Sequence, residues 1–226
     1  MKKGCYPVDG SPFFVNWSRV PTYFCRMKKL VSAQLPCEHG NFVMIAFGSD
    51  VKKMPHLALV HKELLDEQGS MRIHSNVPVR IHSECMTGDV FGSKRCECGE
   101  QLQMALRILG SNATPGILLY LRQEGRGIGL VEKLKAYNLQ DEGLDTFEAN
   151  RALGHADDNR HYGTAVDILR HLGVTNIELM TNNPEKLKAM KDAGIAAERV
   201  SLEIPPNDVN AGYLASKRDA GHLLAQ

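Results

Sequence analysis

Short hydrophobic runs in the first half of the chain predict strands. The segments 41–47 (NFVMIAF) and 57–61 (LALVH) are apolar or alternating, and a polar stretch with Gly48 and Pro55 separates them. The segment 77–82 (VPVRIH) alternates apolar and polar positions, which is typical of a strand with two unlike faces. This part of the chain is therefore expected to be rich in strands.

In the second half, helical and strand patterns alternate. Helices are predicted at 101–109, at about 128–139, in a short segment ending at Gly154, in a segment striped by Val166, Leu169 and Leu172, and from Pro184 to Gly194, with strands at 116–121 and 177–180. Asp145 and Glu148 form a capping-box pattern. Asn183 before Pro184 indicates an N-cap followed by proline at the first helical position.

Alternation of strands and helices predicts a sheet flanked by helices. Because the first half is strand-rich, the expected fold class is α/β of a mixed α+β kind, with a mixed sheet in a single domain that covers residues 29–226. Residues 1–28 are interpreted as a poorly patterned N-terminal extension, since prolines and a glycine interrupt them and no period emerges.

Composition narrows the class of partner. Hydrophobic residues make up 43% of the chain and charged residues 23%, and the net charge is +1. Without a basic excess, neither nucleic acid nor an anionic membrane is expected as a partner. The sequence contains no run near the ~20 apolar residues of a spanning helix and no signal-peptide core. We therefore expect a cytoplasmic protein whose six cysteines are reduced thiols.

Three of those cysteines lie close together, in the pattern Cys85-x10-Cys96-x-Cys98. Three thiolates from one loop can bind Zn²⁺ at about 2.3 Å each, and zinc prefers four ligands in a tetrahedron. No fourth cysteine lies nearby, so the fourth position can be water, as in a hydrolytic site. A closed structural site completed by His82 or His74, or a cluster that binds no metal, is the alternative.

A glycine-rich segment, Arg122-Gln-Glu-Gly-Arg-Gly-Ile-Gly129, stands between a predicted strand and a predicted helix. Its glycines allow a ligand to approach the backbone, and the N-terminus of the following helix offers free N–H groups to an anion. Arg122 and Arg126 add fork-shaped donors that suit phosphate. The spacing matches neither a dinucleotide fingerprint nor a Walker loop, and a simple tight turn is the alternative.

Two further polar segments are candidates for the same ligand. Asp158 and Arg160 stand two apart between predicted helices, although a solvated loop would look similar. Thr181 and Lys186 follow a strand and enter a helix, which is where open α/β sheets bind ligands. Helix capping alone would explain the Asn and Pro between them.

Taken together, the motifs resemble the GTP cyclohydrolase II family in content and order, from about Leu30 to the segment Gly221-His-Leu-Leu. The matching motifs are Arg80-Ile-His-Ser-Glu-Cys-Met-Thr-Gly-Asp89, Arg95-Cys-Glu-Cys-Gly-Glu-Gln101, Gln123-Glu-Gly-Arg-Gly-Ile-Gly-Leu130, Tyr137-x2-Gln-Asp141, Asp145-Thr-x-Glu-Ala-Asn150, Asp158-Asn-Arg160 and Thr181-Asn-Asn-Pro184.

The resemblance implies a set of roles for individual residues. Cys85, Cys96 and Cys98 would bind one Zn²⁺ per subunit, and Mg²⁺ would accompany the triphosphate. The implied GTP contacts are Arg80, Ile81, His82, Ser83, Glu84, Gln101, Glu124, Gly125, Arg126, Thr146, Thr181 and Lys186. The implied catalytic residues are Tyr137, Asp158 and Arg160. A cytoplasmic homodimer is also implied.

The implied reaction is hydrolysis of GTP at C8 of guanine, with release of formate and pyrophosphate. The resemblance casts Arg160 as a nucleophile and Asp158 as its base. Because a guanidinium has a pKa above about 12, we instead interpret Arg160 as stabilising phosphoryl charge. The alternatives are a relative that retains the formyl group, which Tyr137 argues against, and a regulatory GTP-binding homologue without catalysis. A purely structural zinc module fits the glycine-rich turn poorly.

Overall fold

A computed structural model describes residues 27–51, 53–156, 158–219 and 221–223. Among these residues, seven strands form one sheet in the order β1-β2-β3-β5-β4-β6-β7. The strands are β1 (Lys28–Cys37), β2 (Gly40–Gly48), β3 (His56–His61), β4 (Val77–Ser83), β5 (Ile117–Leu121), β6 (Asn176–Met180) and β7 (Ala196–Val200). Strands β1, β2, β3 and β5 pair antiparallel, whereas β5, β4, β6 and β7 pair parallel. The expected mixed sheet in a single domain is confirmed.

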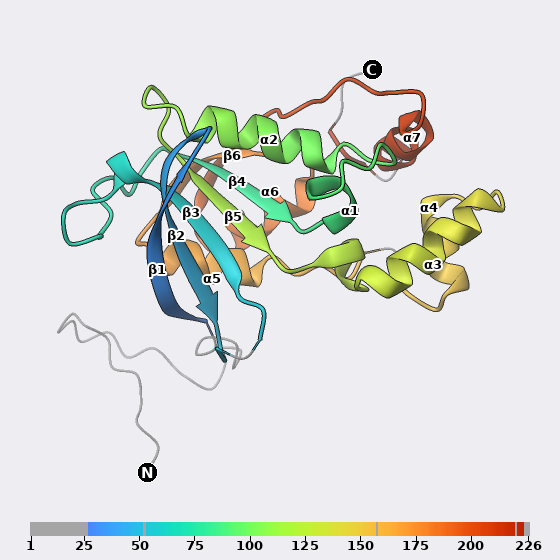
Figure 1. Ribbon diagram of the computed structural model, residues 1–226, viewed down its shortest axis with the longest axis horizontal. Coiled ribbons are helices and arrows are strands. Elements are labelled where there is room, and N and C mark those ends of the chain that lie inside the picture. Colours follow the sequence, from blue (N-terminus) through green and yellow to red (C-terminus); the bar gives the residue numbers. More distant parts are fainter. Residues whose placement is uncertain (1–26, 52, 157, 220, 224–226) are drawn as a thin grey trace, which may run out of the picture.

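Helices cover both faces of this sheet (Figure 1). They are α1 (Met86–Asp89), α2 (Cys98–Leu109), α3 (Leu130–Asp141), α4 (Thr146–Ala152), α5 (Gly163–His171), α6 (Pro184–Asp192) and α7 (Ala211–Asp219), with short 3-10 turns at Lys62–Leu64 and Glu124–Gly127. Helix α2 packs on one face, and α5 and α6 pack on the other. Helices α3 and α4 lie to one side of the sheet, beyond the carboxyl ends of β4 and β5.

The central strand β5 shows how the two cores form. Because side chains alternate along a strand, Ile117 and Leu119 enter the core beneath α5, whereas Leu118 packs beneath α2. All three are almost completely buried. A strand buried on both faces reads as a continuous apolar run, which is the pattern of this segment in the sequence.

The predicted helix caps are present. The Asp145 carboxylate accepts hydrogen bonds from the N–H groups of Phe147 and Glu148, at 2.7 and 2.8 Å, and Glu148 accepts one in return from Asp145 N–H. The side chain of Asn183 accepts a hydrogen bond from Glu185 N–H at 2.9 Å, with proline at the first turn of α6.

Four elements were not predicted: β1, α1, β7 and α7. Strand β1 is mostly exposed at the edge of the sheet, so it carries no strong apolar alternation. The proposed extension covers residues 1–28, of which residues 1–26 lie outside the described part of the chain. Lys28, the last residue of that range, is the first residue of β1.

The carboxyl ends of three adjacent parallel strands create the setting for the site. Strand β4 leads into residues 85–98, the cysteine segment, which includes α1. Strand β5 leads into the glycine-rich segment, and β6 leads into Thr181. In parallel sheets such ends lie at one edge, where ligands bind. Segments far apart in the sequence are thereby brought together (Figure 1).

Close packing of α1 against α2 leads to a first prediction. A Cβ atom at Gly99 would lie 2.3 Å from the carbonyl oxygen of Gly88, so Gly99→Ala must push the two helices apart. We expect a loss of roughly 1–3 kcal/mol in the free energy of unfolding, measured by urea denaturation. Gly212→Ala is the matched control, because it meets no atom within 4 Å in helix α7. Equal urea midpoints for the two variants would refute this account of the packing.

Candidate functional site

A pocket opens at this edge of the sheet. Its walls come from β4, the cysteine segment, the glycine-rich segment, α3, the start of α6 and the C-terminal segment. Seven Lys and Arg side chains line the pocket against three Glu side chains. The lining is therefore positively charged, which suits an anionic ligand.

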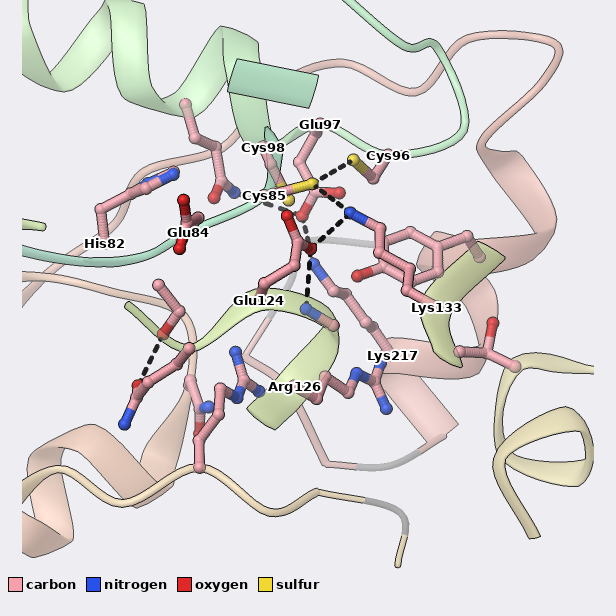
Figure 2. A pocket seen from close by; sticks show the side chains of 18 of the residues that line it. His82, Glu84, Cys85, Cys96, Glu97, Cys98, Glu124, Arg126, Lys133 and Lys217 are labelled. Atoms are coloured by element: carbon pink, nitrogen blue, oxygen red, sulfur yellow. Dashed lines mark hydrogen bonds and ion pairs between the residues drawn. The ribbon is translucent and has the colours of Figure 1, made fainter. Parts of the chain in front are cut away.

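The three cysteines meet in this pocket (Figure 2). Their sulfur atoms all lie within 4.8 Å of one another, and the Sγ atoms of Cys85 and Cys96 are 3.6 Å apart. Ligands about 2.3 Å from a tetrahedral zinc would be about 3.8 Å apart, so the cluster needs only a small adjustment to hold a metal. Among the described residues, no His, Asp or Glu completes the group.

The two histidines considered as a fourth ligand have other partners. His82 Nε2 lies 3.0 Å from the Asp89 carboxylate, and His74 Nδ1 lies 3.0 Å from Gly173 O. A closed site completed by either histidine is therefore not supported. Three thiols with one open coordination position fit the residues present.

Lys133 stands beside the cysteines and was missed by sequence reasoning. Its ammonium donates to Cys85 Sγ at 3.0 Å and to Glu124 Oε1 at 2.8 Å (Figure 2). Hydrogen bonds from the thiols of Cys96 and Cys98 lower the pKa of Cys85, and Lys133 lowers it further. The arrangement therefore favours a thiolate at Cys85. The only sequence signal was the spacing of Lys133 from Ala136 on the buried side of α3.

Glu124 ties the glycine-rich segment to the cysteine segment. Its Oε2 accepts a hydrogen bond from Met86 N–H at 2.6 Å, and its Oε1 accepts one from Gly125 N–H at 2.7 Å. Together with the Lys133 contact, these bonds use both carboxylate oxygens. Glu124 is therefore well placed to hold two walls of the pocket in register.

A buried carboxylate, Asp89, anchors the start of the cysteine segment. It accepts hydrogen bonds from Cys85 N–H at 2.9 Å and Tyr120 Oη at 2.8 Å, and it contacts His82. The side chains of His82 and Asp89 are 2% and 3% exposed. Because each group would be costly to leave unpaired, Asp89 fixes where the backbone presents Cys85.

This network gives a second prediction. Asp89→Asn keeps the shape but puts an amide N–H where an oxygen accepted a bond, so we expect a loss of roughly 1–3 kcal/mol of folding stability. Metal affinity should fall roughly 10–100-fold, as for partners that orient ligands. Urea unfolding and chelator competition measure the two effects. Asp141→Asn, at an exposed ion pair with Arg95, is the control; equal effects in both variants would contradict the anchoring role.

Two buried basic side chains line the pocket, and within the described residues neither donates a hydrogen bond to a carboxylate. Arg80 donates to Met180 O at 2.9 Å and to Gln101 Oε1 at 2.7 Å, and Lys186 donates to Ile81 O at 2.7 Å. Burial lowers the pKa of Arg80 to about 10. Burial, and then the charges of Arg80, Arg160 and Lys217, lower the pKa of Lys186. An anion bound beside these two side chains would stabilise their charged forms, which burial disfavours.

Asp158 and Arg160 form a two-pronged ion pair. The guanidinium Nε and Nη2 of Arg160 both donate to the Asp158 carboxylate. Burial opposes the charge of Arg160, yet the hydrogen bonds to Asp158 raise the pKa of Arg160 above its ordinary value. Arg160 lines the pocket, whereas Asp158 is not among the lining residues and its side chain is 39% exposed. The structure therefore does not support the alternative that this segment is only a solvated loop.

The glycine-rich segment turns sharply. Gly125, Arg126 and Gly127 have φ angles of 60°, 59° and 93°, a left-handed region that glycine enters without strain. A Cβ atom at Gly127 would lie 3.1 Å from Asn159 O, and Asn159 N–H donates to Arg126 O at 3.0 Å. The turn thus packs against the Asp158–Arg160 segment and sets Arg126 in the pocket lining.

Arg122 does not have the phosphate-facing position considered for it. Its Nη1 donates to Glu84 Oε1 at 2.6 Å and its Nε donates to Pro55 O at 3.2 Å. Arg122 is also absent from the pocket lining. The pairing removes this arginine from the set of candidate anion ligands.

Most residues singled out from the sequence do line the pocket. They are Arg80, His82, Ser83, Glu84, Cys85, Cys96, Cys98, Gln101, Glu124, Gly125, Arg126, Tyr137, Thr146, Arg160, Thr181 and Lys186. Ile81 does not, because its side chain is fully buried in the core. Its backbone carbonyl instead holds Lys186.

Several lining residues were not foreseen besides Lys133. They include Glu97, Asn182, Tyr213, Lys217 and His222. Three of these belong to the C-terminal part of the chain, where α7 was not predicted. Its apolar pattern is weak, since among its residues only Leu214 is buried.

Within the described part of the chain, no helix combines the length and the apolarity that a bilayer crossing requires.

Comparison with known proteins shows the following similarities. A family model described as GTP cyclohydrolase II matches residues 28–201. The chain is 48% identical over 194 residues to the GTP cyclohydrolase-2 of Picrophilus torridus, covering 85% of this chain and 96% of that protein. It is 46% identical over 200 residues to the riboflavin biosynthesis protein RibBA of Bacillus subtilis, covering 88% and 48%. For RibBA of Endomicrobium trichonymphae the identity is 44% over 212 residues, covering 93% and 50%. The chain thus spans about half the length of these two RibBA proteins.

Proposed function

The chain belongs to the GTP cyclohydrolase II family, and on that premise we propose that it hydrolyses GTP at C8 of guanine. The products would be formate, pyrophosphate and 2,5-diamino-6-hydroxy-4-(5-phosphoribosylamino)pyrimidine, in the first step of riboflavin biosynthesis. One observation carries the proposal: a three-cysteine cluster and a group of buried cations share one pocket. Both features suit a nucleoside triphosphate. The cysteine cluster would serve hydrolysis of the base, and the cations would bind the anionic phosphates.

Cys85, Cys96 and Cys98 would hold one Zn²⁺ per subunit, and Mg²⁺ would accompany the triphosphate. The spacing of the three sulfur atoms supports this assignment. Zinc in such a site supplies a Lewis acid and lowers the pKa of water. Lys133 supports the thiolate form of Cys85, and Asp89 and Glu124 keep the cysteine segment in place.

Tyr137 is the proposed proton donor at the guanine end. Burial raises the pKa of Tyr137, so its hydroxyl is protonated at neutral pH and can donate. The hydroxyl lies 3.4 Å from Thr87 Oγ1, and Lys133 stands over its ring at 5.7 Å. Both neighbours belong to the surroundings of the cysteines, which places Tyr137 on that side of the pocket.

Arg160 would act on the phosphates as a fixed positive charge. Because Asp158 holds its guanidinium in the charged form, Arg160 is poorly suited to attack phosphorus and well suited to stabilise developing phosphoryl charge. Arg80, Arg126 and Lys186 would bind the triphosphate beside it. Of the remaining candidate contacts, Gln101 orients Arg80, and Ser83, Thr146 and Thr181 offer hydroxyl groups to the nucleotide.

Product analysis tests this function. The zinc-loaded chain would be incubated with GTP and Mg²⁺, and formate, pyrophosphate and the pyrimidine would be assayed together. Equal amounts of formate and pyrophosphate are the expected result. Pyrophosphate with a formylated pyrimidine would show that the second hydrolysis is lost despite Tyr137. GTP binding without either product would replace the enzyme with a regulatory GTP-binding protein.

A cytoplasmic homodimer completes the proposal. The surface of α3 supports it, because Val131 and Leu134 are 67% and 45% exposed there, and apolar exposure of this kind suits an interface. Val131→Glu should lower the mass found by sedimentation to that of one chain. Retention of the dimer would place the interface elsewhere.

A further inference from the structure

The C-terminal segment, residues 211–219 and 221–223, forms a wall of the pocket that the family match does not include. The match ends at residue 201. Tyr213, Lys217 and His222 nevertheless line the pocket together with the cation group.

Hydrogen bonds hold this segment against the rest of the site at two places. Lys217 Nζ donates to Glu97, the residue between two of the cysteines (Figure 2). Farther along, Leu223 N–H donates to Asn182 O at 2.8 Å, and Arg199 Nη2 donates to Leu223 O at 2.7 Å. The side chain of Glu97 is 2% exposed, so the first contact is a buried ion pair. The segment therefore has a defined position against the pocket.

The turn after α7 fixes His222 beside Lys217. Gly221 has φ +86° and its N–H donates to Arg218 O at 2.8 Å, while His222 N–H donates to Lys217 O at 3.0 Å. This pair of bonds is the Schellman arrangement that ends a helix at a left-handed glycine. The backbone thus carries His222 back over the last turn of α7.

The imidazole of His222 has an unused polar atom in charged surroundings. Its Nδ1 is buried and makes no hydrogen bond within the described residues. Burial, together with the charges of Lys217, Arg160, Arg126 and Lys186, lowers the pKa of His222 to about 4. A neutral imidazole has one N–H to donate, and His222 lies among four basic side chains. An anion would accept the hydrogen bond and would also be attracted by the surrounding positive charge.

We propose that His222 donates an imidazole N–H to a phosphate oxygen of the bound triphosphate, next to Lys217 and Lys186. The C-terminal segment then closes the phosphate end of the pocket. This inference rests on the proposed function for the identity of the ligand, but its recognition chemistry is that of any polyphosphate.

The test uses inorganic pyrophosphate and guanosine as separate probes. Calorimetry measures the binding of each probe to the full-length chain. His222→Ala should weaken pyrophosphate binding by at least about tenfold, the worth of a hydrogen bond to a charged group. Guanosine binding should stay within about twofold. His171→Ala, at an exposed histidine on α5 outside the pocket lining, should change neither.

A second variant separates the contact from a loss of folding. His222→Asn places an amide N–H near the position of Nδ1, so we expect it to recover pyrophosphate binding to within about threefold of the unaltered chain. Unchanged pyrophosphate binding in His222→Ala, loss of guanosine binding instead, or no pyrophosphate binding by the unaltered chain would each overturn the inference. Formate assays stay separate, so the proposed function can fail while this anion contact stands.

Discussion

Replacing Cys96 with serine is expected to remove both bound zinc and formate release. Cys96 is buried, and its sulfur lies 3.6 Å from that of Cys85, so a serine leaves two thiols that hold zinc far less tightly. The Lewis acid contributes several kcal/mol to such a hydrolysis. We therefore expect the rate of formate release to fall about a thousandfold or more, together with a metal content near zero.

Metal analysis and a formate assay on the same preparations measure this prediction. Cys37→Ser is the matched control, because Cys37 is a free, exposed cysteine on β1, and it should leave metal content and rate unchanged. A Cys96→Ser protein that still releases formate at the original rate would show that the cysteine cluster does not serve the reaction.

Arg160→Ala is expected to slow pyrophosphate release by about 10²–10³-fold. The reason is that Arg160 is the ion-paired guanidinium in the pocket lining, and a preorganised charge aimed at a phosphoryl group has effects of that size. Arg160→Lys keeps a charge without the two-pronged geometry, so a smaller loss of about tenfold is expected. Rapid-quench experiments measure the rate of pyrophosphate release by both variants.

The lysine variant decides between two roles for this residue. Substantial pyrophosphate release by Arg160→Lys supports charge stabilisation and excludes an obligatory arginine-bound intermediate. Complete loss in both variants would support the covalent role that the resemblance implies. Arg107→Ala, an exposed arginine on α2, controls for the removal of positive charge alone.

The parts of the fold that sequence could predict are those with a strong local signal. The apolar run of β5 identified a strand buried on both faces, and Asp145 and Asn183 marked helix starts through their capping geometry. Strand β1 and helix α7 lack such signals. Among the described residues, strand β1 pairs with β2 alone and is largely exposed, and α7 buries little more than Leu214. Both are held by tertiary contacts rather than by local pattern.

The candidate site was likewise predictable from the sequence only where the signal was local. Cysteine spacing predicted the cluster because Cys85, Cys96 and Cys98 come from one segment. Arg122 was misinterpreted because its partner Glu84 directly follows the neighbouring strand β4, and spacing along the chain carries no information on that pairing. Lys133 and His222 were missed because their roles depend on which segments meet at the carboxyl ends of β4, β5 and β6.

Zinc titration of the metal-stripped chain tests the central claim most directly. The protein would be freed of metal with a chelator, zinc would be added in steps, and formate release from GTP in the presence of Mg²⁺ would be measured at each step. The account predicts that formate release is absent without zinc, rises linearly and reaches its limit at one zinc per chain. Full formate release by the stripped chain, or a Cys96→Ser chain that zinc activates equally well, would contradict it.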